Sequence, residues 1–507
     1  MLTYQLDQRG TASLYEYLYT CIRADIESGA IAAHEKLPSK RTLAKHLGVS
    51  LITIEGAYAQ LAAEGYLYSI ERKGYFACPL SIGSTPSPPP VWEAPRNDLR
   101  TPLARATAQA NLHRASENAE TPADAASDAS AAECPVADFS SGSHAAGLFP
   151  YNTWAKTVRE ALTCESEQTL LNESSAAGSY RLRETLASYL KGFRGMQVLP
   201  EQIIVGAGAQ LLYIMIVQLL GRSCRFAVED PGYPRLTKIY RSNEAALSHV
   251  PMDQGGIVVE ALRASAADVV HIMPSHQFPT GMVTPISRRY ELLGWANEHE
   301  NRYVVEDDYD CEFRLAGRPI PPLQAIDASE RVIYVNTFAK SLGPAFRIGY
   351  LVLPPHLAER FAAELGFYSC TVSAIDQLAL ARFIESGDYE RHINRMRSHY
   401  RTVQNELACA LKASAASDRI AIEAQDSGLH FIMHVDTLAD DDALAAAFRK
   451  HGVALDPLSG FFQRDFAACA PLERERYEHR FIVNCDGIER STIFPASEAI
   501  AQAIASV

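Results

Sequence analysis

Lys340 is the residue whose surroundings raise the first chemical question. It lies in TFAKSLGPAFRIG (337–349), directly after VIYVN (332–336), a run of β-branched and aromatic residues that predicts a buried strand. An ammonium without a counter-charge at the end of such a strand carries a large desolvation cost. A Schiff base with an aldehyde removes that cost, because the amine then no longer has to be an ammonium. The position therefore predicts a covalent role for Lys340.

Other polar motifs also stand at the ends of apolar runs that predict strands. These runs are continuous and not alternating, which favours a mostly parallel sheet covered by helices on both faces. Ligands of such sheets gather at the carboxyl ends of the strands. We therefore expect one site to be formed by VGAGAQ (205–210), VEDPGYPR (228–235), PSHQFPTG (274–281) and YVVEDDYDCEFR (303–314). Small residues in the first motif let backbone N–H groups approach a phosphate.

The residue types at these strand ends suit pyridoxal phosphate. The aldehyde needs a lysine, and a carboxylate such as Asp307 keeps the pyridine nitrogen protonated, so that the ring can accept electrons. An arginine such as Arg347, seven residues after Lys340, can bind the phosphate together with backbone donors. The alternative interpretation is a metal site, although the spacing is not that of a calcium loop. Its ligands would be Glu306, Asp307, Asp308 and Asp310.

The N-terminal residues predict a separate DNA-binding unit. Residues 13–28 have apolar side chains at helical spacing, and residues 36–67 divide into two helices with Ser39 and Ser50 as N-caps. The turn between the two helices, LGVS, is short and contains glycine, as in a helix-turn-helix. The β-prone segment YLYSIERKGYFA (66–77) then predicts a hairpin, or wing.

The distribution of charge favours DNA as the partner of this unit. The net charge of the whole chain, −13, argues against nucleic acid, but residues 1–80 carry eight basic and eight acidic residues, so the acidity lies elsewhere. Local basic clusters are what phosphate contacts need. A small helical dimerisation module is the alternative interpretation of the pattern. The candidate DNA contacts are Ser39, Lys40, Arg41, Lys45, Ser50, Thr53, Arg72 and Lys73.

Length and composition limit the remaining possibilities. A chain of 507 residues that is 47% apolar has room for several domains with hydrophobic cores. Residues 81–135 are rich first in proline and then in alanine, serine and acids, which predicts a linker. There is no apolar run of about 18 residues, no secretion pattern and no cysteine spacing typical of zinc. We therefore expect a cytoplasmic protein without a metal site or a membrane anchor.

The motifs also resemble known families. LPSKRTLAKHLGVS, AYAQLAAEGYL and the wing resemble the winged helix-turn-helix of GntR-type regulators. Residues 136–507 resemble a fold-type-I aminotransferase through LFPYNTW, AGSYRLRETLASYL, EDPGYPR, PSHQFPTG, EDDYDCEF and FAKSLGPAFRIGY. Together they resemble the MocR family. The resemblance implies a DNA-binding domain over residues 1–80, the linker 81–135 and an α/β pyridoxal-phosphate-binding domain over 136–507, with a mostly parallel sheet and a smaller C-terminal α+β part.

The resemblance also assigns roles to single residues. Lys340 matches the Schiff-base lysine, Asp307 the carboxylate on the pyridine nitrogen, and Tyr309 the tyrosine that hydrogen-bonds the ring hydroxyl. Arg480, in HRFIVNCDGI (479–488), matches the arginine that grips the carboxylate of an effector, and Arg235 matches a second arginine that faces the effector. The other implied cofactor contacts are Tyr233, which stacks on the ring, His276 and Gln277, which face it, and Ala209, Gln210, Thr337 and Arg347 at the phosphate.

Three residues depart from the family pattern. Leu51 stands where an arginine commonly begins the recognition helix. Ala339 replaces the serine of the usual FSK, which removes one hydroxyl from the phosphate pocket, and Asn336 replaces a glycine. These changes put conventional operator recognition and full cofactor affinity in doubt.

The resemblance leads to a functional expectation with alternatives. We expect a pyridoxal-phosphate-dependent transcription regulator that senses a small amine or amino acid, or pyridoxal phosphate itself, through exchange at Lys340. The expected assembly is a homodimer of head-to-tail type, with each DNA-binding head against the partner's large domain. A working aminotransferase with a vestigial head is the alternative, since the sequence keeps every residue that transamination needs.

Overall fold

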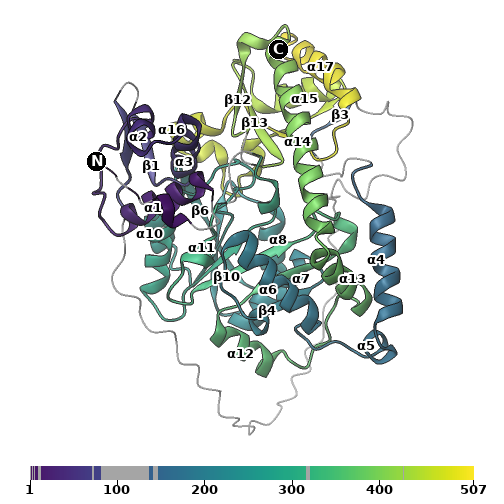
Figure 1. The fold of residues 1–507 in the computed structure, drawn as a ribbon. Coiled ribbons are helices and arrows are strands. Elements are labelled where there is room, and N and C mark those ends of the chain that lie inside the picture. Colours follow the sequence, from purple (N-terminus) through teal and green to yellow (C-terminus); the bar gives the residue numbers. More distant parts are fainter. Residues whose placement is uncertain are drawn as a thin grey trace.

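The computed structural model describes residues 2, 4, 6–9, 13–70, 73–80, 136–140, 147–315, 320–425 and 428–507. The expected linker 81–135 and Arg72 therefore lie outside the described residues. Figure 1 shows an N-terminal head on one side, a central sheet with its helices, and a C-terminal part above them. Within the described ranges, no helix combines the length and the apolar character needed to cross a membrane.

The head is a winged helix-turn-helix, as the sequence predicts. Its elements are α1 (Leu14–Glu27), α2 (Lys40–Leu47), α3 (Leu51–Ala63), β1 (Leu67–Ile70) and β2 (Gly74–Ala77). Ser39 and Ser50 accept hydrogen bonds from the backbone N–H groups of Thr42 (3.1 Å) and Thr53 (3.2 Å), so both predicted N-caps are confirmed. The two strands pair antiparallel, which confirms the wing.

The large sheet follows the predicted α/β pattern. Its order is β4-β11-β10-β9-β8-β5-β6-β7 among the described residues. The pairs β10–β9, β9–β8, β8–β5 and β5–β6 are parallel, whereas β11 runs antiparallel to both of its neighbours and β7 to β6. The strands are β4 (Ile203–Gly206), β5 (Arg225–Asp230), β6 (Ala246–Asp253), β7 (Gly256–Ile257), β8 (Val269–Ile272), β9 (Tyr303–Asp307), β10 (Val332–Thr337) and β11 (Gly349–Val352).

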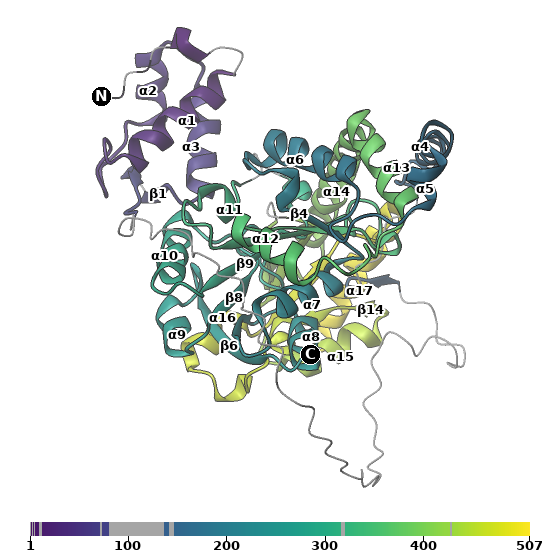
Figure 2. The same cartoon turned by 90° about the horizontal axis from the view of Figure 1, so that it is seen from below.

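Helices cover both faces of this sheet, and Figure 2 shows α6 and α7 on opposite sides of it. Ile333 and Val335 of β10 pack into the core beneath α7, α8 and α12, and Tyr334 between them packs into the core on the α6 side. The continuous apolar runs thus bury alternate residues on two faces. The helices are α6 (Tyr180–Arg194), α7 (Ala209–Leu220), α8 (Pro234–Ser242), α9 (Val259–Ala264), α10 (Ile286–Asn297), α11 (Leu323–Ile326) and α12 (Pro355–Glu364).

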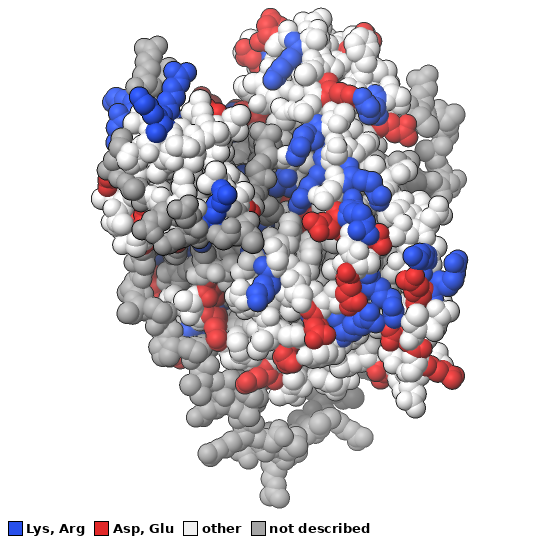
Figure 3. Space-filling model, viewed as in Figure 1, with Lys and Arg blue, Asp and Glu red and all other residues white. Residues whose placement is uncertain are grey.

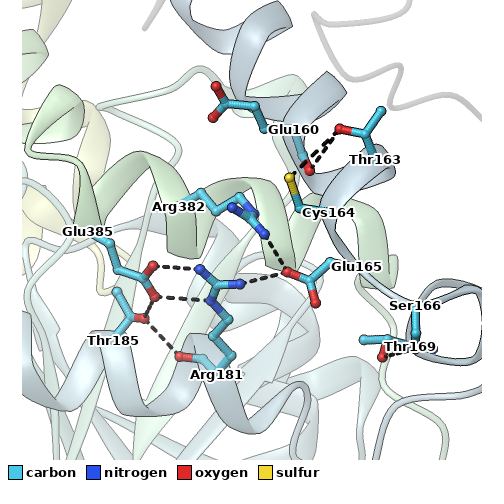
Figure 4. A network of polar contacts seen from close by, with 10 residues as sticks. All are labelled: Glu160, Thr163, Cys164, Glu165, Ser166, Thr169, Arg181, Thr185, Arg382 and Glu385. Carbon is cyan, nitrogen blue, oxygen red and sulfur yellow. Dashed lines mark hydrogen bonds and ion pairs between the residues drawn. The ribbon is translucent and has the colours of Figure 1, made fainter.

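Four further helices lie beside α6, and a polar network joins α6 to two of them, α4 and α13. The four helices are α4 (Tyr151–Cys164), α5 (Glu167–Leu171), α13 (Ala374–Glu385) and α14 (Asp388–Ala413). Arg181 of α6 reaches Glu165 over 2.6 Å and Glu385 over 2.7 Å, and Arg382 of α13 reaches Glu165 over 2.6 Å (Figure 4). Arg181 and Glu385 are 34% and 40% exposed, so their ion pair adds little to the free energy of unfolding. The network mainly orients these helices relative to one another.

The C-terminal part is the smaller α+β unit that was expected. It contains β12 (Ile420–Glu423), β13 (His430–Val435), β14 (Val453–Ala454), β15 (Asp456–Pro457) and β16 (Arg480–Asn484), with α15 (Asp441–Lys450), α16 (Pro471–Tyr477) and α17 (Ile493–Ala505). Its sheet has the order β12-β13-β16-β15. The short β3 (Ala137–Asp138) pairs with β14, so the chain after the expected linker begins against this unit.

The head packs against the start of α10. Ile286, the first residue of α10, is 5% exposed and belongs to the head's hydrophobic core together with Leu61 and Tyr66. The half-buried Tyr290 of α10 packs against the same core. The head is therefore attached to the large domain by apolar contacts within one chain (Figures 1 and 2).

Candidate cofactor and effector site

Lys340 and Asp486 meet at the centre of the site. Lys340 follows the end of β10, and Asp486 follows the end of β16. The lysine Nζ donates to Oδ2 of Asp486, whose side chain is 1% exposed, against 25% for the lysine. Burial opposes the charge on Lys340, but the carboxylate raises the pKa of the ammonium above its ordinary value. Asp486 is therefore the counter-charge of the lysine in this structure.

Asp307, the last residue of β9, is held from two sides. Tyr213 of α7 donates to its Oδ2, and Nε2 of His271 lies 3.3 Å from the same oxygen. Burial, and then the charge of Asp307, raise the pKa of Tyr213 well above its ordinary value, so the tyrosine remains a neutral donor. The second oxygen, Oδ1, is buried and accepts no hydrogen bond from any described residue. Asp307 therefore keeps one acceptor free.

Tyr309 and His276 lie together beside Asp307. The Tyr309 hydroxyl is 3.1 Å from Nδ1 of His276, which also lies 2.6 Å from Asp310. The His276 Nε2 is buried and has no partner among the described residues. By contrast, the Gln277 side chain bonds the carbonyl of Pro231 and groups of its own loop. Of the two ring-facing candidates, His276 is thus the one with an open polar atom.

Arg347 lies against the turn between β4 and α7. Its guanidinium donates to the carbonyl oxygen of Ala207 over 3.2 Å. A Cβ added to Gly208, whose φ is +78°, would stand 2.7 Å from the guanidinium, so only glycine permits this approach. Ala209 and Gln210 form the first turn of α7, where backbone N–H groups have no helical partner. An arginine and a helix N-terminus together suit a phosphate.

Thr337 is the other residue that the sequence predicts at the phosphate. It ends β10 and is 7% exposed, opposite Gly349 of β11. Arg347 has a positive φ of 52° at the end of the loop that begins at Lys340. Thr337, Lys340 and Arg347 are thus held by the end of β10 and the loop that follows it.

The four carboxylates of the alternative metal site, Asp307 among them, contact different partners. Glu306 accepts from the backbone N–H groups of Leu323 and Gln324, and Asp308 pairs with Arg194. Asp307 faces Tyr213, and Asp310 faces His276, as described above. Within the described part of the chain, no group of three or more His, Cys, Asp or Glu side chains is arranged for a metal ion. The alternative metal interpretation therefore finds no support in this arrangement.

Aromatic rings form a wall beside the lysine. Tyr233, the N-cap of α8, meets Phe278 edge to face at 5.7 Å, and Phe278 meets His430 and Phe461 at 5.7 and 5.5 Å. Burial, and then the charges of His276 and Lys340, lower the pKa of His430 well below its ordinary value. His430 is therefore neutral, and the wall adds no positive charge.

The two expected effector arginines lie on different elements, Arg480 in β16 and Arg235 in α8. Arg480 begins β16, pairs with Glu423 at 3.2 Å and donates to the carbonyl oxygen of Glu475. In the β13–β16 register it stands opposite His434, four residues along β13 from His430. Arg235 is exposed at the start of α8. Their contact with an effector stays a prediction.

The expected DNA-facing residues lie on the surface of the head. Arg41, Lys45 and Lys73 are exposed, and Figure 3 shows basic side chains gathered at the outer edge of the head. The Lys40 ammonium lies over the Tyr75 ring of the wing, 5.2 Å from its centroid. The Ser50 hydroxyl lies 2.7 Å from that of Thr53, so both hydroxyls take part in the cap of α3.

These groups fit pyridoxal phosphate. Asp307 offers a free, buried acceptor of the kind that a protonated pyridine nitrogen needs. The glycine turn, the N-terminus of α7 and Arg347 form an anion cradle. Lys340 follows β10, the strand that pairs with β9 and its Asp307, and supplies the amine.

Known proteins share both parts of the chain. The family described as aminotransferase class I and II matches residues 137–469, and the family described as bacterial regulatory proteins, gntR family, matches residues 14–76. The uncharacterized HTH-type transcriptional regulator YhdI of Bacillus subtilis is 36% identical, over 90% of this chain and 90% of its own length. The probable rhizopine catabolism regulatory protein MocR of Rhizobium meliloti is 32% identical, over 90% and 89%.

The chain belongs to the MocR family of regulators. The multiple substrate aminotransferase of Thermococcus profundus is similar in structure, with a TM-score of 0.62 and 23% identity over 74% of this chain and 92% of that one. This likeness confirms the predicted fold of the large domain, a mostly parallel sheet of the aminotransferase type, and the match of residues 14–76 confirms the GntR-type head.

The departures from the MocR-family pattern have structural consequences. The Asn336 amide lies 3.2 Å from the Cys311 sulfur and from the Tyr334 hydroxyl, so it is used inside the core. Ala339, beside Lys340, offers no hydroxyl. Leu51 is 36% exposed and the next residue, Ile52, is 79% exposed, so the recognition helix begins with an apolar surface.

Sequence reasoning missed five residues of this MocR-family site. They are Tyr213, His271, His430, Asp486 and, named only as a ligand of the alternative metal site, Asp310. Tyr213 and His271 lie inside apolar runs that were read only as secondary structure. Asp486 lies in the motif HRFIVNCDGI, which the sequence analysis uses only for Arg480. The position of Asp486 after the apolar run of this motif is a signal that could have found it.

Proposed function

We propose that this protein is a DNA-binding transcription regulator that holds pyridoxal phosphate and senses a small amine at Lys340. The observation that carries the proposal is the single chain segment that joins the site to the head. Residues 274–285 lie between β8 and α10, include His276, and lead into the first turn of α10, on which the head packs. A change at the site is thus connected to the DNA-binding unit through one short segment.

The segment is stiff enough to transmit a displacement. Its ends are tied together, because the Thr284 N–H donates to the carbonyl oxygen of Pro274 over 2.9 Å. Arg289 of α10 is 1% exposed and donates to the same carbonyl and to that of Thr284. Buried hydrogen bonds of this kind make the segment and the start of α10 move as one body.

Each residue near Lys340 has a defined task in this proposal. Asp307 would hold a proton on the pyridine nitrogen, and Tyr213 and His271 would keep its carboxylate in place. Arg347, Thr337, Ala209 and Gln210 would bind the phosphate, Tyr233 would cover the ring, and Tyr309 and His276 would face the ring hydroxyl. Pyridoxal phosphate supplies an aldehyde that reacts reversibly with primary amines. Cofactor contact by Gln277 stays a prediction.

The proposal extends to domains and assembly. We assign DNA binding to residues 1–80, cofactor and effector binding to residues 136–507, and a connecting role to residues 81–135. A homodimer is expected from the family, whereas the head of this chain packs on the large domain of the same chain and not in the expected head-to-tail way. Light scattering of the purified protein, with and without pyridoxal phosphate, measures this directly.

Two measurements on one preparation test the function. The wild type with pyridoxal phosphate should absorb in the visible range, and Lys340→Ala should not. It should also bind DNA from its own upstream region, measured by fluorescence anisotropy, with an affinity that falls as salt rises. The absence of specific DNA binding, together with many turnovers on an amino acid and a keto acid, would favour an aminotransferase instead.

A further inference from the structure

The carboxylate of Asp486 is available to more than Lys340. Its Oδ2 accepts from the lysine, whereas its Oδ1 is buried and accepts no hydrogen bond from any described residue. The side chain is 1% exposed, so water does not freely replace the missing partner. An acceptor left unpaired in a buried place is costly, and a ligand donor at that oxygen would remove the cost.

The surroundings of Asp486 suit a cation. Asp486 follows the end of β16, close to His430, which pairs in register with Asn484. His430 is neutral, its ring lies tilted to that of His276 with the centroids 4.4 Å apart, and Phe278 stands edge-on to it. A carboxylate beside aromatic faces attracts an organic ammonium through both charge and the ring quadrupole.

The same place is poorly suited to a carboxylate. Among the described residues, Lys340 is the cation that pairs with Asp486. The guanidinium of Arg480 is occupied by Glu423, and that of Arg464 by Asp230 at 2.6 Å and Glu473 at 2.7 Å. A carboxylate placed at the free oxygen of Asp486 would meet a like charge in a buried place, where like charges repel strongly.

We propose that Asp486 selects the effector, which is a primary amine with a second amino group and no carboxylate. With pyridoxal phosphate bound, one amine of the effector would take the place of the Lys340 amine on the aldehyde carbon, so that one C=N bond forms as another breaks and Lys340 leaves as a free amine. The second amine would lie as an ammonium on the free oxygen of Asp486. This inference rests on the proposed amine-sensing function and names the class of amine. Asp486 is a specificity-determining residue in this scheme.

A pair of four-carbon probes tests the proposal. 1,4-Diaminobutane and 4-aminobutanoate carry the same reacting amine and differ in the far group, ammonium or carboxylate. Each is titrated into the wild type loaded with pyridoxal phosphate, and the change in visible absorption gives the half-saturating concentration. We expect the diamine to saturate at a concentration about tenfold lower, the ratio that one charge-assisted hydrogen bond provides.

Variants assign the preference to Asp486. Asp486→Asn should bring the two probes within about twofold of each other, and Asp486→Glu should keep the preference for the diamine. Asp418→Asn, an exposed aspartate of the same unit, is the matched control. The retained visible band shows that each variant still holds the cofactor. If Asp486→Asn does not fold, the ratio of the half-saturating concentrations of the two probes, measured in the wild type and in Asp486→Glu, still tests the proposal.

Either of two results would overturn the proposal: tighter binding of 4-aminobutanoate by the wild type, or an unchanged preference in Asp486→Asn. In the first case Arg480→Gln should weaken 4-aminobutanoate, as the carboxylate hypothesis requires. Failure of the proposed function has a different signature, namely no visible band in the wild type or no specific DNA binding.

Discussion

The backbone N–H of Ile286 donates a hydrogen bond to the carbonyl oxygen of Glu64 over 3.0 Å. Ile286 begins α10, and Glu64 is the C-cap of α3 in the head. The first N–H group of α10 has no partner within its own helix, and it bonds a carbonyl group at the end of α3 that also has none. This bond fixes the recognition helix relative to the segment that carries His276.

The first prediction concerns the contact beside this bond. Gly65 has a φ of +79°, and an added Cβ would lie 2.6 Å from Cβ of Pro285. Gly65→Ala should therefore suffer both backbone strain, about 1–2 kcal/mol, and loss of the docking contact. Hydrogen exchange of α3 and α10 should rise in this variant, because the head detaches more often.

Gly29→Ala is the control, since Gly29 has nearly the same φ, +78°, with nothing within 4 Å of an added Cβ. This variant should destabilise the head by a similar strain and leave exchange in α10 unchanged. Equal exchange of α10 in the two variants would contradict the docking role of Gly65.

The second prediction concerns Arg347. Its guanidinium is exposed and lies on the Gly208 turn, where the phosphate is proposed to bind. Arg347→Gln removes charge-assisted hydrogen bonds of about 1.5–3 kcal/mol, so the Kd for pyridoxal phosphate should rise roughly 10–100-fold. Absorption titration of the apoprotein measures it. Arg360→Gln, whose arginine pairs with Glu364 on α12, should leave the Kd unchanged.

The third prediction concerns DNA. Arg41 is exposed on α2 of the head, and if it neutralises one phosphate, Arg41→Gln should lower the slope of log affinity against log salt by about 1. Anisotropy at several salt concentrations gives the slope. Lys412→Gln, an exposed lysine at the end of α14, serves as the control. A slope that stays the same in Arg41→Gln would exclude this phosphate contact.

Much of the site could be predicted from the sequence because its motifs stand at strand ends. Asp307 ends β9, Lys340 follows β10, and Arg347 lies in the loop between β10 and β11, so the topology brings them to one edge of the sheet. Lys340 and Arg347 share one short motif, and Asp307 and Tyr309 share another. The chemistry can therefore be recognised before the fold is known.

The rest could not be predicted, because it depends on packing between distant segments. Tyr213 and Asp307 are 94 residues apart, and Lys340 and Asp486 are 146 apart. Nothing local marks Asp486 as the partner of a lysine, since an aspartate after a strand is commonly a turn residue. Likewise Ile286 has the pattern of an ordinary helix start, and its burial in the head's core appears only in three dimensions.

The last prediction is a pH dependence of stability that depends on Glu229. This glutamate of β5 is 4% exposed, and burial raises its pKa to about 8, although the Met273 N–H bonds one oxygen. The folded state thus holds a proton that the unfolded state releases near pH 4.5, so stability is lost as the pH rises toward 8. Between pH 5.5 and 8 the loss should reach up to about 3 kcal/mol. Glu229→Gln should remove this component in urea unfolding, whereas Glu498→Gln, an exposed residue of α17, should keep it. Identical pH profiles for wild type and Glu229→Gln would show that Glu229 is ionised in the folded protein.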